Sequence, residues 1–340
     1  MSSTLVIQTS FLGDTVLTTP LLAQLANRGP VDVVTTPASA ALLANHPAVR
    51  HVIPYDKRGT DRGVFGLLRL ARRLRRAHYD LALLAQGSWR SAALARLARI
   101  PERVGFETSA GRLLYSKRVP YRDDLHHAAR LLMLARPNGR EPLAEELRPS
   151  LAPGETERAA VDALLARHDV TPDEGLVALA PGSVWGTKRW PYFPELAQRL
   201  APRARVVVIG SRDDAPLAGA ITTAEPSVID ATGALSLLAS AELIGRCAVV
   251  VTNDSAPLHL ASAMGTPTVA IFGPTVPEFG FGPLSPRASV VGEETLACRP
   301  CDRHGPQRCP LGHHRCMRDL TPALVAERAL ALLHTPDVQA

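Results

Sequence analysis

Short apolar segments alternate along the chain with longer segments of helical periodicity. In the first half, apolar runs suggest strands, and the segments between them repeat apolar residues every three to four positions. The strands are expected at 5–8, 31–34, 51–53, 80–85 and 103–106, and the helices at 16–25, 39–45, 63–77 and 88–98. This alternation predicts parallel strands joined by right-handed helical crossovers.

The pattern is interrupted at 148–154 by Pro- and Gly-containing sequence typical of an exposed linker, and then restarts. Strands are expected at 176–180, 206–209, 227–229, 248–251 and 268–272, and helices at 193–201, 213–221, 235–245, 256–264 and 322–333. We therefore predict a domain over 1–150, a second over 156–320, and a C-terminal helix and tail over 321–340. The last helix is amphipathic and is expected to dock back across the domains.

Composition fits this division. A chain of 340 residues is long for one core and suits two domains. Hydrophobic residues make up 46% and aromatic residues only 4%, a mixture that favours helices on parallel strands over a β-sandwich. The predicted fold class is α/β, with two doubly wound sheets whose ligands bind beyond the carboxyl ends of the strands, in a cleft between the sheets.

The net charge and the first residues of the sequence limit the partners and the cellular location that we expect. The net charge of +6 favours anionic partners, namely nucleic acid, anionic lipid or phosphorylated small molecules. Nucleic acid is disfavoured because no basic patch has interleaved aromatic residues. The sequence has no signal-peptide pattern and no apolar run of membrane-spanning length, so we expect a cytoplasmic protein, with peripheral contact with the inner membrane surface as a further expectation.

Asp14 follows Gly13 where the first strand should turn into its helix. Two interpretations are equally open: a residue that caps the helix, with Gly13 making the turn, or a carboxylate that accepts a proton from an attacking hydroxyl.

Two segments of the second half combine loops with helix starts. The segment 181–191 follows a strand and carries Ser183, Lys188 and Arg189. Its glycines do not have the spacing of a Walker A loop, but its cations and backbone N–H groups suit a pyrophosphate. The alternative is a solvated basic loop. The segment 252–259 ends a strand and opens a helix whose N-terminus suits a diphosphate, with Asp254 or Ser255 as the N-cap and His259 one turn in.

Two enzyme classes fit poorly. No strand is followed by Gly-x-Gly-x-x-Gly, which disfavours a nicotinamide dehydrogenase. No Gly-x-Ser-x-Gly elbow occurs, which disfavours a Ser-His-Asp hydrolase.

Taken together, these motifs resemble glycosyltransferase family 9, the ADP-heptose:lipopolysaccharide heptosyltransferases, over nearly the whole chain. The motifs are Gly13-Asp14-Thr15 with Thr19-Pro20, Tyr79-Asp80-Leu81 before Gln86-Gly87-Ser88, Arg103-Val104-Gly105-Phe106, Pro181-Gly182-Ser183 through Lys188-Arg189-Trp190-Pro191, Asn253-Asp254-Ser255 with His259, and Phe272-Gly273-Pro274-Thr275.

This resemblance implies a GT-B fold, with an acceptor-binding first domain and a nucleotide-sugar-binding second domain. It implies inverting transfer of heptose from ADP-heptose to the lipid-linked inner core of lipopolysaccharide, with no cofactor required. Asp14 would be the general base and Lys188 would neutralise the leaving diphosphate. Ser183, Asp254, Ser255, His259 and Thr275 would contact the nucleotide sugar. The alternatives are a family member that uses another nucleotide sugar and a non-catalytic relative that binds a nucleotide or lipid.

Four of the five cysteines crowd into one segment. Cys298, Cys301, Cys309 and Cys316 have the spacing C-x2-C-x7-C-x6-C, which is similar to segments of the heptosyltransferase II branch. Four thiols at this spacing suit a structural zinc site, with His313 and His314 as spare ligands. The alternative is a set of free or loosely paired thiols, and neither interpretation makes a metal catalytic.

A basic stretch runs from Lys57 to Arg76. Its apolar positions predict a helix that buries Phe65, Leu68 and Leu74 on one face. The arginines are either a solvated face or a surface for the phosphates and acidic sugars of a lipid-linked acceptor.

Overall fold

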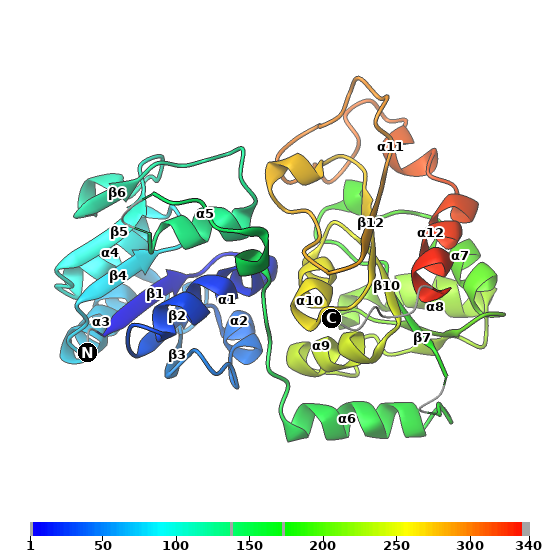
Figure 1. Ribbon diagram of the computed structural model, residues 1–340, viewed down its shortest axis with the longest axis horizontal. Helices are drawn as coiled ribbons and strands as arrows, with labels where there is room; N and C mark the ends of the chain where they lie inside the picture. Colours follow the sequence, from blue (N-terminus) through cyan, green and yellow to red (C-terminus); the bar gives the residue numbers. More distant parts are fainter. Residues whose placement is uncertain (1–2, 137–138, 172–173, 335–340) are drawn as a thin grey trace. The chain divides into compact units, whose positions relative to one another are not determined.

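The computed structural model describes residues 3–136, 139–171 and 174–334, which form two compact units (Figure 1). The units are Met1–Ala152 and Pro153–Ala340, so the break falls inside the expected linker. Residues 335–340 of the predicted C-terminal tail lie outside the described residues.

The first unit is built on a parallel sheet of six strands, in the order β3-β2-β1-β4-β5-β6. Its strands are β1 (Thr4–Gln8), β2 (Val31–Thr35), β3 (His51–Pro54), β4 (Leu81–Leu84), β5 (Glu102–Phe106) and β6 (Lys117–Val119). The central strands β1 and β2 are buried along their whole length, as expected where helices cover both faces.

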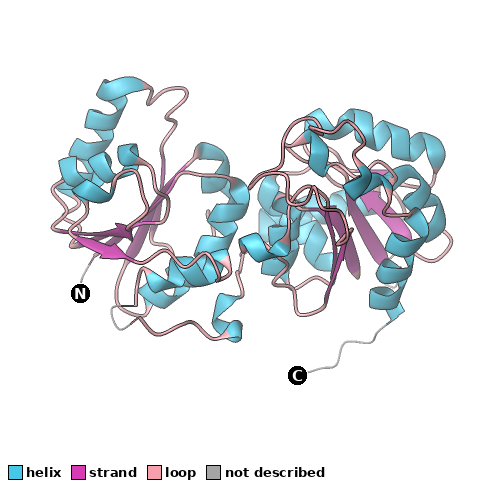
Figure 2. Cartoon of the chain, turned by 90° about the horizontal axis from the view of Figure 1, so that it is seen from above, coloured by secondary structure: helices cyan, strands magenta, loops and turns pink. Residues whose placement is uncertain are grey.

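Helices cover both faces of this sheet (Figure 2). They are α1 (Leu12–Ala26), α2 (Pro37–Leu42), α3 (Gly63–Arg76), α4 (Trp89–Leu97) and α5 (His127–Met133), with the short 3-10 helices η1 (Arg112–Leu114) and η2 (Ala144–Leu147). α1 packs against α2 and α5, whereas α3 packs against α4. α3 buries Leu67, Leu70 and Leu74 in one core with Leu5 and Leu84. Of the residues predicted to be buried on this helix, Leu74 is buried and Leu68 half-buried, but the prediction was wrong for Phe65, which is exposed.

The second unit repeats this plan with the strand order β12-β11-β10-β7-β8-β9. Its strands are β7 (Leu176–Ala180), β8 (Arg205–Val208), β9 (Ile229–Asp230), β10 (Val249–Asn253), β11 (Thr268–Phe272) and β12 (Ala288–Gly292). Its helices are α6 (Glu155–Ala166), α7 (Phe193–Leu200), α8 (Ala215–Ala224), α9 (Leu237–Arg246), α10 (Ala256–Met264), α11 (Arg315–Arg318) and α12 (Pro322–His334), with η3 (Gly186–Lys188), η4 (Arg212–Asp214) and η5 (Pro277–Phe279).

Both sheets are doubly wound in the same sense. When the strands are numbered along each unit, their spatial order is 3-2-1-4-5-6, so the order in which strands are added to the sheet reverses between the first and fourth strands. Ligands of such sheets bind beyond the carboxyl ends of the strands at this reversal. The fold therefore directs attention to the ends of β1 and β4 in one unit and of β7 and β10 in the other.

The predicted fold class is confirmed, but some elements were missed. Each sheet has a sixth strand at its edge, and neither was predicted. β6 has only three residues, two of them charged and exposed, and only one residue of β12 is buried, so neither carries the apolar run used to predict strands. α5 and α6 were also not predicted.

The last helix packs within the second unit. α12 packs on α7, β10 and β11, and it places Val325, Ala326 and Ala329 in the core of the second unit. Within the described residues, no helix has both the length and the apolar character needed to cross a membrane.

Candidate active site

In the second unit, Asn253 joins the two predicted ligand-binding segments at the reversal of the sheet. It is the last residue of β10 and is fully buried. Its side-chain Nδ2 donates to the carbonyl of Pro181, at 2.8 Å, and its Oδ1 accepts the N–H of Trp190, at 3.2 Å. The segment 181–190 is therefore fixed against the end of β10, as the fold class predicts.

Lys188 and Asp254 form a buried ion pair at this point. Lys188 Nζ lies 2.5 Å from Asp254 Oδ2, and their side chains are only 10% and 9% exposed. Thr275, which follows β11, donates its hydroxyl to the same oxygen at 2.7 Å. An ammonium group has three donors, so the contact with Asp254 leaves two for an incoming anion.

Ser255 and His259 lie on α10. Ser255 is the N-cap, and in the described part of the chain its buried Oγ has no hydrogen-bond partner. The helix start therefore combines a favourable dipole with an unused hydroxyl, which suits an anionic ligand. Pro257 has no N–H, and the N–H of Leu258 donates to the carbonyl of Ser255 at 3.1 Å. His259 is buried one turn further on, with its ring edge-to-face against Phe281.

Ser183 lies in the loop after β7. Its hydroxyl accepts the N–H of Trp185 at 3.3 Å, which shapes the loop ahead of Lys188. The structure thus brings Ser183, Lys188, Asp254, Ser255, His259 and Thr275 to the ends of three neighbouring strands or the first turn of α10.

Asp14 belongs to the first unit, in the first turn of α1, and both of its carboxylate oxygens have a partner. Oδ2 accepts the N–H of Phe11, the N-cap, at 3.2 Å, and Oδ1 lies 3.4 Å from Nε2 of His127. The capping interpretation is therefore supported, although it does not exclude proton transfer. Gly13 was wrongly placed in the turn, because the helix already begins at Leu12.

Burial strongly raises the pKa of the Asp14 carboxyl group. Desolvation raises its pKa to about 6, against a smaller lowering by the Phe11 N–H. A carboxyl group that titrates near neutrality is a better general base than one with an ordinary pKa, because it is still ionised at pH 7 and holds a proton more strongly. This property suits catalysis better than capping alone.

His127, the residue that faces Asp14, was not predicted from the sequence. It lies at the start of α5, which packs against α1, and its side chain is only 12% exposed. The sequence gives no signal that could have found it, because residues 14 and 127 are joined only by the packing of the two helices.

We expect His127→Ala to shift the pH dependence of turnover. Removing this donor should raise the pKa of Asp14 further, because hydrogen bonds to the charged form favour ionisation. The rising limb of the pH–rate profile should then move to higher pH, and a rise of about one pKa unit would lower turnover at pH 7 about twofold. His127→Gln should restore part of the rate, and an unchanged profile in the alanine variant would exclude this role.

The basic stretch divides into two parts in the structure. Lys57 reaches back to the end of β1, where its Nζ donates to the carbonyl of Thr9 at 2.7 Å. Burial, with the nearby Arg58 and Arg90, lowers the pKa of Lys57. Lys57 thus lies at the same edge of the sheet as Asp14, whereas the arginines from Arg69 onward lie along α3.

The cysteine-rich segment lies against the Lys188 loop. His314 Nε2 lies 2.8 Å from the carbonyl of Thr187, and Gln307 bonds to both Gly186 and Val184. Cys298 Sγ is 4.0 Å from Nε2 of His313, and burial raises the pKa of Cys316 to about 11. In the described ranges, no three His, Cys, Asp or Glu side chains are grouped to hold a metal ion, so the residues as placed do not fit a zinc site.

Two Rossmann-like units, one with a cation and a helix N-terminus at its sheet reversal, are the arrangement of the GT-B fold, which glycosyltransferases share with other enzymes. Residues 67–309 match the model of glycosyltransferase family 9 (heptosyltransferase), and the chain belongs to this family. It is 30% identical to lipooligosaccharide heptosyltransferase 2 of Haemophilus influenzae, over 97% of this chain and 99% of that protein.

Two further relatives agree with this assignment. The chain is 31% identical to lipopolysaccharide heptosyltransferase 2 of Salmonella typhimurium, over 97% of this chain and 98% of the relative. It superposes on the structure of the Escherichia coli ADP-heptose LPS heptosyltransferase II with a TM-score of 0.79, at 28% identity and 98% coverage of both chains. The predicted family, fold type and enzyme class are thereby confirmed.

Proposed function

We propose that this chain transfers heptose from ADP-heptose to the lipid-linked inner core of lipopolysaccharide, with inversion at the anomeric carbon. The observation that carries the proposal is the buried Lys188–Asp254 pair beside the start of α10, at the sheet reversal. The names of the relatives, all heptosyltransferases, supply the sugar and the acceptor.

The second unit is assigned to the donor. Lys188 and the N–H groups at Ser255 would hold the diphosphate, and Thr275 would keep Asp254 in place. Asp254 uses Oδ2 for Lys188 and Thr275, which leaves Oδ1 to accept a hydroxyl of the sugar. Ser183 and His259 are assigned further contacts with the nucleotide sugar.

The first unit is assigned to the acceptor. The acceptor hydroxyl attacks the anomeric carbon and Asp14 takes its proton, while the bond from that carbon to the diphosphate oxygen breaks and its electron pair leaves with ADP. Attack opposite the leaving group inverts the configuration. Lys57, at the same sheet edge as Asp14, is assigned to an acidic group of the acceptor.

A turnover assay tests the proposal directly. The purified protein is incubated with a truncated core acceptor and a panel of nucleotide sugars, and the product is analysed by mass spectrometry. We expect addition of one heptose from ADP-heptose alone. Preferred transfer of another sugar would support the alternative family member, and ADP binding without transfer would support a non-catalytic relative.

The proposed chemistry needs no metal. We expect turnover to survive EDTA, because a carboxylate and cations carry every step, whether or not about one zinc is bound at the cysteines. Metal analysis of anaerobically purified protein reports the zinc content separately. Loss of activity in EDTA, restored by one divalent ion, would contradict the mechanism.

A further inference from the structure

Exposed apolar side chains gather at one edge of the first unit. Val64 and Phe65 are 66% and 87% exposed, Trp89 is 63% exposed and Leu113 is 80% exposed. They come from the connections that leave β3, β4 and β5, so all lie at the carboxyl edge of the sheet, the edge that also carries Asp14.

Two contacts hold these connections together. Arg90, next to Trp89, donates to the carbonyl of Gly63 at 2.9 Å, which joins the starts of α4 and α3. A Cβ atom on Gly111 would lie 3.1 Å from the Cα of Trp89, so the backbone before η1 packs on the start of α4. We call the four exposed side chains the apolar tip.

Beside the apolar tip, α3 presents an arginine face made of Arg69, Arg72, Arg73 and Arg76. These residues are at i, i+3, i+4 and i+7, all are exposed, and they line an open hollow on the outer side of the helix. Phe65 lies on the same stripe, one turn before Arg69. Within the described residues, an ion pair is recorded only for Arg69, with Asp61 at 2.6 Å.

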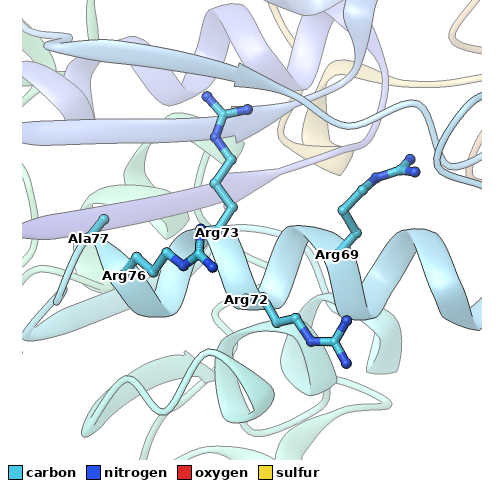
Figure 3. Close-up of a pocket in the computed structure, with 5 residues that line it drawn as sticks. All are labelled: Arg69, Arg72, Arg73, Arg76 and Ala77. Atoms are coloured by element: carbon cyan, nitrogen blue, oxygen red, sulfur yellow. The ribbon is translucent and has the colours of Figure 1, made fainter.

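This face has features of a surface that binds many anions. Like charges three and four residues apart destabilise an isolated helix. The helix dipole favours Arg73 and Arg76 in the last turn, but not Arg72 in the turn before it. Figure 3 shows the four guanidinium groups spread apart rather than converging on one point, which suits a plane of phosphates better than a single phosphate.

We propose that the arginine face and the apolar tip dock the protein on an anionic phospholipid membrane. Arginines near an anionic leaflet are attracted to its headgroups, and exposed Phe and Trp side chains insert at the interface. The exposed Leu and Val side chains, which stack on no base, favour a lipid interface over nucleic acid. The proposal rests on the proposed function in one respect: a lipid-linked acceptor would then meet Asp14 at the docked edge.

The experiment measures co-sedimentation of the full chain with vesicles. One set is phosphatidylcholine alone, and the other contains roughly one third phosphatidylglycerol, enough for a negative surface potential. We expect binding only to the anionic vesicles, and weaker binding at high salt. No binding to anionic vesicles at low salt, or equal binding to both sets, would overturn the proposal.

A charge-matched pair of variants tests the surface itself. Arg72→Glu with Arg76→Glu should lower the partition coefficient at least ~10-fold, because two attractive charges become repulsive. The control, Arg199→Glu with Arg203→Glu, changes the net charge equally on exposed residues of the second unit and should bind as the wild type does. Equal losses in the two variants would overturn the proposal.

The apolar tip is tested by Phe65→Ser, which should weaken binding several-fold even at high salt, where the electrostatic contribution is screened. Turnover of a water-soluble, delipidated acceptor should be unchanged in the α3 variants, with unchanged melting temperatures. Vesicle binding without heptose transfer would contradict the proposed function alone, and transfer without vesicle binding would contradict the docking proposal alone.

Discussion

Lys188→Ala is expected to lower ADP affinity at least ~10-fold and turnover by about 10²-fold. The reason is that a cation on the diphosphate acts in the ground state and gains strength as negative charge develops on the leaving group. Calorimetric titration with ADP and a turnover assay with saturating donor measure the two effects separately. Unchanged affinity and rate would remove Lys188 from the site.

The ion pair complicates the single variant. Removing Lys188 leaves Asp254 buried with only the Thr275 hydroxyl recorded on its Oδ2, and breaking a buried pair costs about 3–5 kcal/mol of stability. A loss of activity could then reflect unfolding rather than a lost contact with the donor.

The double variant Lys188→Ala with Asp254→Asn separates these effects. It removes both buried charges, and the amide oxygen of Asn can still accept from Thr275. We expect a melting temperature close to wild type, with ADP affinity as low as in the single variant. If the double variant regained affinity along with stability, Lys188 would be a structural residue only.

The strand ends of the second unit were predictable because their signals are local. The segments 181–191 and 252–259 each follow an apolar run, and parallel strands bring their carboxyl ends to one edge. The sequence therefore indicated which residues meet at this edge. It did not indicate that Lys188 and Asp254 would pair, because opposite charges in two loops do not reveal which atoms will face each other.

The first unit shows where sequence reasoning stops. The contact between Asp14 and His127 depends on how α5 packs on α1, and α5 itself was not predicted. Likewise, the exposed positions of Phe65, Trp89 and Leu113 contradict the usual expectation for apolar residues, so only the structure separates them from the core. Edge strands such as β6 were missed because few of their residues are buried.

Asp14→Asn is expected to keep donor affinity and lower turnover by roughly 10²-fold or more. The acceptor hydroxyl is a poor nucleophile until its proton is removed, and a well-placed base contributes roughly 10²–10⁴-fold. Asn preserves the shape and the acceptor for the Phe11 N–H, so the helix cap survives. Near-normal turnover, measured with the same acceptor, would mean that Asp14 is a cap and that the base lies elsewhere.

The pH dependence gives a second signature of the base. Because burial raises the pKa of Asp14 to about 6, the wild-type rate should fall about tenfold per pH unit below pH 6 and level off above it. The residual rate of Asp14→Asn should lack this limb. If the pH–rate profile of the variant kept a rising limb at the same pH, this limb would belong to the titration of another group.

Stability measurements test the buried carboxylate of Asp14 independently of turnover. The pKa of Asp14 is about 6 when folded against a model value of 3.8, so between these values the folded state binds more protons and wild-type stability falls as pH rises. Above pH 6 the accumulated cost is up to about 3 kcal/mol. Asp14→Asn carries no such cost, so its free energy of unfolding should exceed that of the wild type at about pH 7, and the difference should shrink toward about pH 4. Urea unfolding at the two pH values measures this change. A variant that is more stable but slower would show that the wild type keeps a costly buried carboxylate for catalysis, whereas a stability difference that does not change between the two pH values would contradict the raised pKa of Asp14.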